Sequence, residues 1–78
     1  MSILRRSFCV SGTMSRPRKE IHELIRTNGG IVHETVKSGT DYLVVGTAVG
    51  ATKLLRARNL GTEILEEDEF LDMLDMDE

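Results

Sequence analysis

The sequence predicts an α/β fold whose elements follow the order β-α-β-β-α-β-α. Short apolar runs bounded by turn residues alternate with stretches of helical periodicity. The first run, Phe8-Cys9-Val10, is continuously apolar, which suits a strand of a parallel sheet covered on both faces. Glycines follow each of the first two helical stretches. The chain has 78 residues, so we expect a single domain, residues 1–78, with a folded core from about 6 to 74.

The first strand and helix are predicted from residues 6 to 30. Residues 6–11 form the strand. Ser15 is expected to cap the helix, and Pro17 fits its first turn, where a missing N–H costs nothing. Asn28-Gly29-Gly30 ends the helix, because glycine readily takes the left-handed conformation after a last turn. The helix carries an apolar stripe at spacing i, i+3, i+4, formed by Ile21, Leu24 and Ile25.

Two strands and a loop follow. Residues 31–32 predict a short strand, and residues 34–41 are polar with a turn signal near their end. Residues 42–45 form the most apolar strand, and residues 46–50 the loop after it.

The last third of the chain predicts a helix, a strand and a helix. Residues 52–59 form the first of these helices, with Leu54, Leu55 and Leu60 facing inward and Gly61 ending it. Residues 63–65 form a short strand. The final helix spans residues 67–74, and acids occupy its first turn, where the helix dipole favours them. Its apolar stripe is Phe70, Leu71 and Leu74.

The net charge of −3 hides an asymmetry along the chain. Cations dominate up to Arg26, whereas every charged residue from Glu63 onward is acidic. Because screening removes charges beyond about 8–10 Å, the local field at the basic first helix decides whether an anion binds. The acidic end is interpreted either as a solvated helix face or as a contact for a basic partner.

The cysteine and hydropathy patterns predict the cellular setting. The single cysteine, Cys9, lies in an apolar run and is interpreted as a buried core residue. A lone cysteine cannot form an internal disulfide, so a reducing compartment fits: the cytoplasm of a bacterium or the nucleus of a eukaryote. The sequence shows no apolar span for a membrane and no signal peptide, so no membrane partner is expected.

Two strand-to-helix junctions carry the pattern of a phosphate site. Ser11-Gly12-Thr13 closes the first strand and leads into Arg16-Pro17-Arg18-Lys19, and a second loop with glycines leads into Thr52-Lys53. In a parallel sheet such junctions lie at one edge, where helix N-termini present free N–H groups. Small residues, a hydroxyl and a cation at that edge predict phosphate binding.

These motifs together resemble a BRCT domain, over about residues 6–74. The sequence from Ser11 to Arg18 is most similar to the BRCT domains of NAD-dependent DNA ligases and of the replication factor C large subunit. The resemblance implies a four-stranded parallel sheet with two helices on one face and one on the other. Many BRCT domains carry a tryptophan in the last helix where this chain has Phe70, which makes it less like the tandem, phosphopeptide-reading branch. The matching segments are residues 8–13, 28–30, 40–46 and 53–61, then Ile64-Leu65 before the terminal helix.

The resemblance also implies a set of site residues. In phosphate-binding BRCT domains, a hydroxyl and a glycine N–H at the end of the first strand hold the phosphate oxygens, and Ser11 and Gly12 match these positions, with Thr13 beside them. Lys53 matches the lysine at the start of the second helix. Arg18 is the best match for a basic residue of the first helix, with Arg16 and Lys19 close to it. Alternatively, Ser11-Gly12-Thr13 is only a tight turn and the cations are solvated. Thr52 is interpreted as a helix cap.

The sequence argues against catalysis. His22 is expected on a solvent face, and neither it nor His33 has cysteines or carboxylates at metal-ligand spacing. No Walker loop occurs, so no nucleotide, cofactor, metal or small-molecule substrate is expected. The resemblance therefore implies a non-catalytic module of DNA replication or repair that binds DNA at a 5′-phosphate or nick. The module is either a free-standing protein or a fragment of a ligase, clamp loader or other repair enzyme. The alternative is a protein-interaction module of a DNA repair or replication protein that docks a partner, including one with a phosphorylated residue. A small catalytic domain is a third, disfavoured alternative.

Overall fold

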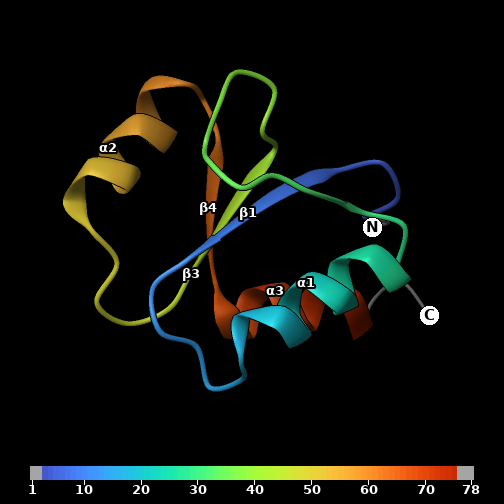
Figure 1. The fold of residues 1–78 in the computed structure, drawn as a ribbon. Coiled ribbons are helices and arrows are strands. Elements are labelled where there is room, and N and C mark those ends of the chain that lie inside the picture. Colours follow the sequence, from blue (N-terminus) through green and yellow to red (C-terminus); the bar gives the residue numbers. More distant parts are fainter. Residues whose placement is uncertain (1–2, 76–78) are drawn as a thin grey trace.

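The computed structural model describes residues 3–75, and its elements follow the predicted order (Figure 1). The α/β fold class is thereby confirmed. Each predicted strand and helix is present: the strands at residues 31–32 and 42–45 have the expected bounds, and the first and last strands and the last two helices differ from theirs by one residue. The elements are β1 (Ser7–Ser11), α1 (Arg18–Thr27), β2 (Ile31–Val32), β3 (Tyr42–Val45), α2 (Ala51–Asn59), β4 (Glu63–Glu66) and α3 (Glu67–Asp75).

The sheet is parallel throughout, with strand order β2-β1-β3-β4. β1 lies in the centre and pairs with β3 from Phe8 to Ser11. On its other side β2 reaches only Ser7 and Phe8. The flank of β1 that faces β2 is therefore open at Ser11, among the residues that the structure describes.

Two helices cover one face of the sheet and one covers the other, as expected (Figure 1). α1 and α3 enclose the larger core, where the Phe8 ring stacks on Tyr42 at 5.0 Å and meets Phe70 edge-on at 5.6 Å. α2 covers the opposite face through a smaller cluster that contains Cys9 and Ala57. Cys9 is fully buried, as predicted.

The inward face of α2 differs from the prediction. Leu54 and Ala57 pack against the sheet, whereas Leu55 is 60% exposed and Leu60 41% exposed. Leu54 and Ala57 are three residues apart and share one helix face, and this rotates Leu55 toward solvent. Leu60 is the C-cap, beyond the last full turn. The expectation that Leu55 and Leu60 face inward is wrong.

The start of α1 is also capped differently from the prediction. Pro17 is the N-cap residue, and no side chain caps the helix. Ser15 instead binds Glu67, at the start of α3: its N–H donates to Oε1 at 2.9 Å, and its hydroxyl donates to Oε2. The expected cap was wrong because a carboxylate 52 residues away along the chain takes the Ser15 hydroxyl.

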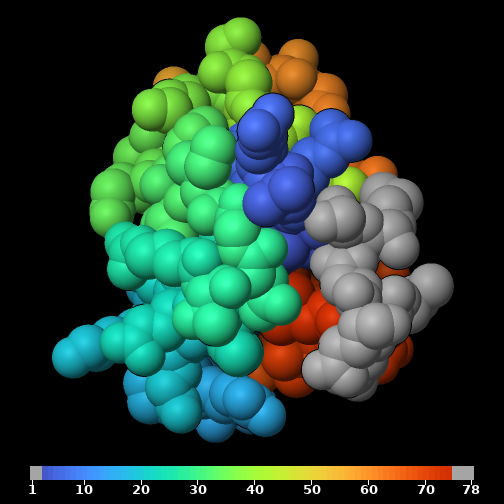
Figure 2. Space-filling model, turned by 90° about the vertical axis from the view of Figure 1, so that its right-hand side faces the viewer, coloured from blue at the N-terminus to red at the C-terminus, as the bar shows by residue number. Residues whose placement is uncertain are grey.

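The segment before β1 packs onto the end of α1. Ile3 is fully buried in the larger core, and the Arg5 N–H donates to the Gly29 carbonyl at 2.9 Å. In Figure 2 this segment, in blue, lies beside the green segment that follows α1. The segment before β1 therefore helps to hold the end of α1 against the sheet.

Candidate phosphate-binding site

Ser11 is the last residue of β1, at the carboxyl edge of the sheet. Side chains alternate along a strand, so Ser11 shares a face with Cys9, which packs toward Ala57 of α2. Ser11 is only 7% exposed, and its hydroxyl has no hydrogen-bond partner among residues 3–75. Because buried hydroxyls usually have a partner, Ser11 is a candidate contact for a ligand.

Gly12 continues the chain with a φ of +87°, in the left-handed region that favours glycine. A Cβ at this position would stand 2.7 Å from the Thr47 carbonyl oxygen. The Gly12 N–H has no hydrogen-bond partner in the described part of the chain. Ser11 and Gly12 therefore offer two adjacent unpaired donors, as phosphate oxygens require.

Thr13 joins this turn to the loop after β3. Its N–H donates to the Thr47 carbonyl at 2.8 Å, and the Thr47 N–H donates back at 2.9 Å. Gly46 lies beneath them, where a Cβ would stand 2.1 Å from the Thr13 carbonyl oxygen. The two junctions therefore lie side by side at one edge, as predicted. The Thr13 backbone serves this bridge, and its side chain is exposed.

Two cations lie at the starts of the helices that follow the two junctions. Lys53 is half-buried in the first turn of α2, and Arg18 begins α1. Burial raises the pKa of the Cys9 thiol, and the positive charges of Lys53 and then Arg18 oppose that rise. Both charges therefore act at Cys9, which precedes Ser11 in β1.

The remaining candidates lie farther from this cluster. Arg16 acts on Glu67: hydrogen bonds from Ser15 lower the pKa of that carboxyl most, and the Arg16 charge adds to the effect. Lys19 is exposed in the first turn of α1. Thr52 is not a helix cap, because Gly50 holds the N-cap position of α2. The structure places Ser11 and Gly12 together at the end of β1, and Lys53 and Arg18 on the first turns of α2 and α1.

Comparison with protein families gives one assignment for this fold. The model of the BRCA1 C Terminus (BRCT) domain matches residues 4–74. The chain belongs to the BRCT family. Among its relatives is a DNA ligase of Mycoplasma mycoides, 43% identical over 72 residues that cover 92% of this chain and 11% of the ligase. A DNA ligase of Rubrobacter xylanophilus is 49% identical over 63 residues, which cover 81% of this chain and 9% of the ligase.

This BRCT chain spans about a tenth of the length of the DNA ligases it matches. The predicted resemblance to a ligase BRCT domain is confirmed, and the resemblance to the replication factor C large subunit stays a prediction. Solved BRCT structures share the fold. Rad4 BRCT1,2 in complex with a Crb2 phosphopeptide superimposes with a TM-score of 0.81 at 15% identity, covering 94% of this chain and 40% of that one. The BRCT domain of human REV1 superimposes with a TM-score of 0.70 at 17% identity, covering 97% of this chain and 77% of that one.

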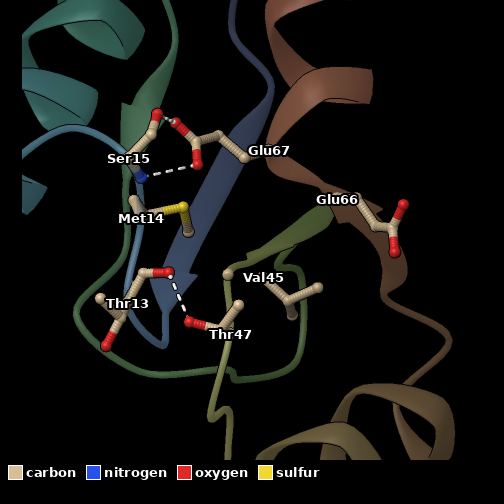
Figure 3. Close-up of a pocket in the computed structure, with 8 residues that line it drawn as sticks. Thr13, Met14, Ser15, Val45, Thr47, Glu66 and Glu67 are labelled. Carbon is tan, nitrogen blue, oxygen red and sulfur yellow. Dashed lines mark hydrogen bonds between the residues drawn. The ribbon is translucent and has the colours of Figure 1, made fainter.

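A cavity of about 480 Å³ opens at the same sheet edge of the BRCT domain, and of the expected site residues Thr13 lines it (Figure 3). Met14 and Val45 contribute its apolar lining. Glu66 and Glu67 add carboxylates, which repel an anion. In Figure 3 Ser15 meets the Glu67 carboxylate, whereas Glu66 points away from the other labelled side chains. Sequence reasoning missed this cavity, although two acids directly after the last strand signal an acidic rim.

The two histidines of the domain have different surroundings. Burial lowers the pKa of His22, which is half-buried rather than on a solvent face as expected. His33 Nδ1 lies 2.8 Å from the Thr40 hydroxyl. Within residues 3–75 no three His, Cys, Asp or Glu side chains gather as a metal site would need. Over the same residues, no helix has the length and apolar character that crossing a membrane requires.

Proposed function

We propose that this BRCT domain, residues 1–78, is a non-catalytic module that binds a terminal phosphate of DNA, at a 5′ end or nick. The observation that carries the proposal is buried Ser11, whose hydroxyl has no hydrogen-bond partner within residues 3–75, next to the Gly12 N–H, which likewise has none there. Its relatives are DNA ligases, enzymes that act on DNA, and this supports DNA as the ligand and an intracellular setting.

The chemistry favours a terminal phosphate over a backbone phosphodiester. Ser11 is a buried residue, so a ligand oxygen must protrude to reach its hydroxyl. A terminal phosphate carries three free oxygens and up to two charges, whereas a phosphodiester offers two oxygens and one charge. Lys53 and Arg18 supply charge opposite those oxygens, and a bond between charged partners is about twice as strong as a neutral one.

A second candidate is a phosphorylated segment of a DNA repair or replication protein. The same hydrogen-bond donors suit the phosphate of a phosphoserine. Rad4 BRCT1,2, which shares this fold, was solved in complex with a phosphopeptide. The net charge of the chain is −3, so outside the candidate site the domain repels DNA, and this favours a protein ligand.

The test is an amide NMR titration of the chain with two probes. One is a short hairpin duplex with a 5′-phosphate, and the other is a peptide with one phosphoserine; each has an unphosphorylated twin. The proposal expects the phosphorylated duplex to shift the Ser11, Gly12 and Lys53 amides more than any other probe. With Arg18, Lys19 and Lys53 facing the duplex, log K should fall against log salt with a slope of about −3. If only the phosphopeptide shifts the Ser11 amide, the ligand is a phosphorylated protein and not DNA. If neither probe shifts it, Ser11 is not part of a phosphate site.

A further inference from the structure

The outer face of α2 carries a second cavity, on the side of the domain away from α1 and α3. Its volume is about 580 Å³, and it lies between α2 and the loop that follows β2. The residues that line it include Lys37 of the loop and, from α2 and its C-cap, Thr52, Leu55, Arg56, Asn59 and Leu60.

The apolar side chains of α2 are distributed against the usual amphipathic pattern. The small Ala57 is fully buried against the sheet, while the larger Leu55 is 60% exposed and Leu60 41% exposed. Both leucines line the same cavity. Scattered exposed leucines need no explanation, but two that share one hollow form a patch of the kind that marks an interaction site.

Charge selects the kind of partner. Lys37 and Arg56 flank the two leucines, and no acidic residue lines the cavity. Lys53 belongs to another surface: it stands four residues before Ala57, on the helix face that turns toward the sheet. The groove is therefore basic, partly apolar and separate from the candidate phosphate site.

We propose that this groove docks a segment of a partner protein that carries apolar side chains flanked by carboxylates, as on an acidic amphipathic helix. Leu55, Leu60 and the aliphatic stems of the two cations would cover the apolar side chains of the partner. The charged ends of Lys37 and Arg56 would pair with the carboxylates of the partner. A second copy of this chain fits less well, because a symmetric contact brings the cations Lys37 and Arg56 of one copy toward those of the other. A DNA backbone would pair with the cations but gains nothing from the leucines.

The test uses a fluorescein-labelled helical peptide that repeats Glu-Glu-Leu-Leu, with the full chain, in anisotropy and amide NMR titrations. A peptide repeating Glu-Glu-Ser-Ser lacks the anchors, and one repeating Lys-Lys-Leu-Leu reverses the charge. The proposal expects only the first peptide to bind and to shift amides of Leu55, Arg56, Asn59 and Lys37. Arg56→Glu should weaken binding about tenfold, as expected when one partner of a contacting charge pair is reversed. Arg58→Glu is the matched control: Arg58 is exposed in the same last turn but does not line the groove.

Several outcomes overturn the proposal. Binding of the first peptide that is equal for Arg56→Glu and Arg58→Glu, or that fails to shift the groove amides, removes the groove as a docking site. Sedimentation that shows dimers dispersed by Leu55→Ser assigns the face to a second copy. Duplex DNA that shifts the groove amides when the acidic peptide does not assigns it to DNA. Lys53→Glu should leave peptide binding unchanged, so the groove and the phosphate site are tested apart.

Discussion

Thr13 and Thr47 hold the two glycine-containing junctions of the sheet together through reciprocal backbone hydrogen bonds of 2.8 and 2.9 Å. The Thr47 hydroxyl adds a third, longer contact to the Thr13 carbonyl at 3.3 Å. The bridge fixes the turn that presents the Gly12 N–H beside the loop that leads to Lys53. Donors held in place before a ligand arrives lose less entropy when they bind it.

Replacing Gly12 tests whether this turn needs its close packing. Gly12→Ala adds a Cβ at a φ of +87° and 2.7 Å from the Thr47 carbonyl oxygen, so the Thr13–Thr47 bridge must shift. We expect a loss of about 1–3 kcal/mol in the free energy of unfolding, measured by urea denaturation. Gly61→Ala is the control, since Gly61 also has a positive φ, +73°, but nothing lies within 4 Å of the added Cβ. An equal cost for both variants would show that the close approach is unimportant.

Lys53 is expected to contribute charge to the phosphate site. Lys53→Glu removes a charge-assisted bond and adds repulsion, so affinity for a 5′-phosphorylated duplex should fall by about 1–3 kcal/mol, several-fold to about a hundredfold. Fluorescence anisotropy measures this. Arg58→Glu changes the net charge equally from an exposed position on the same helix. If Arg58→Glu weakens binding as much as Lys53→Glu does, net charge explains the effect and Lys53 has no special place.

Phe70 anchors α3 to the larger core. It is fully buried and meets the Phe8 ring edge-on at 5.6 Å. Phe70→Ala should cost about 3–5 kcal/mol, a large share of the stability of a small domain. Leu55→Ala, at a position 60% exposed, should change stability by less than about 0.5 kcal/mol. Melting curves compare the two variants, and similar shifts would contradict the packing described for α2 and α3.

Asp41 links the start of β3 to β1 and should make stability depend on pH. Its Oδ2 accepts the Ser7 N–H at 2.8 Å and the Ser7 hydroxyl at 3.1 Å. The backbone bond from Ser7 is the main cause that holds the pKa of Asp41 below its usual 3.8. A lowered folded pKa means that the stabilisation is complete above the unfolded pKa and is lost as pH falls through the folded value. Asp41→Ala should therefore have a lower free energy of unfolding than wild type at neutral pH. The difference between the two free energies should narrow below about pH 3.8. Asp72→Ala, in an exposed position on α3, should show no such narrowing.

The order of elements was readable from the sequence because local patterns decide it. The continuous apolar run around Cys9, Pro17 at a helix start and Gly61 at a helix end each act within a few residues. The strand-to-helix junctions were predicted for the same reason, and so was their meeting at one sheet edge, since parallel strands end together.

Long-range contacts set the limits of that prediction. Ser15 looked like a helix cap, but Glu67, distant in sequence, takes its hydroxyl. Leu55 and Leu60 looked like core, yet the rotation of α2 depends on how closely Ala57 approaches the sheet, which no local pattern reveals. The sequence likewise could not show that no group within residues 3–75 hydrogen-bonds the Ser11 hydroxyl, because that depends on the three-dimensional packing around the end of β1.

Ser11 is the residue on which the phosphate proposal depends most directly. The decisive measurement compares wild type and Ser11→Ala in binding a duplex with and without a 5′-phosphate. Since the hydroxyl has no partner within residues 3–75, the variant should keep its melting temperature. Wild type should prefer the phosphorylated end by about tenfold or more, the value of a hydrogen bond to a charged group, and Ser11→Ala should lose most of that preference. Equal affinity of wild type for the two ends, or a preference that survives in Ser11→Ala, would contradict the proposed site.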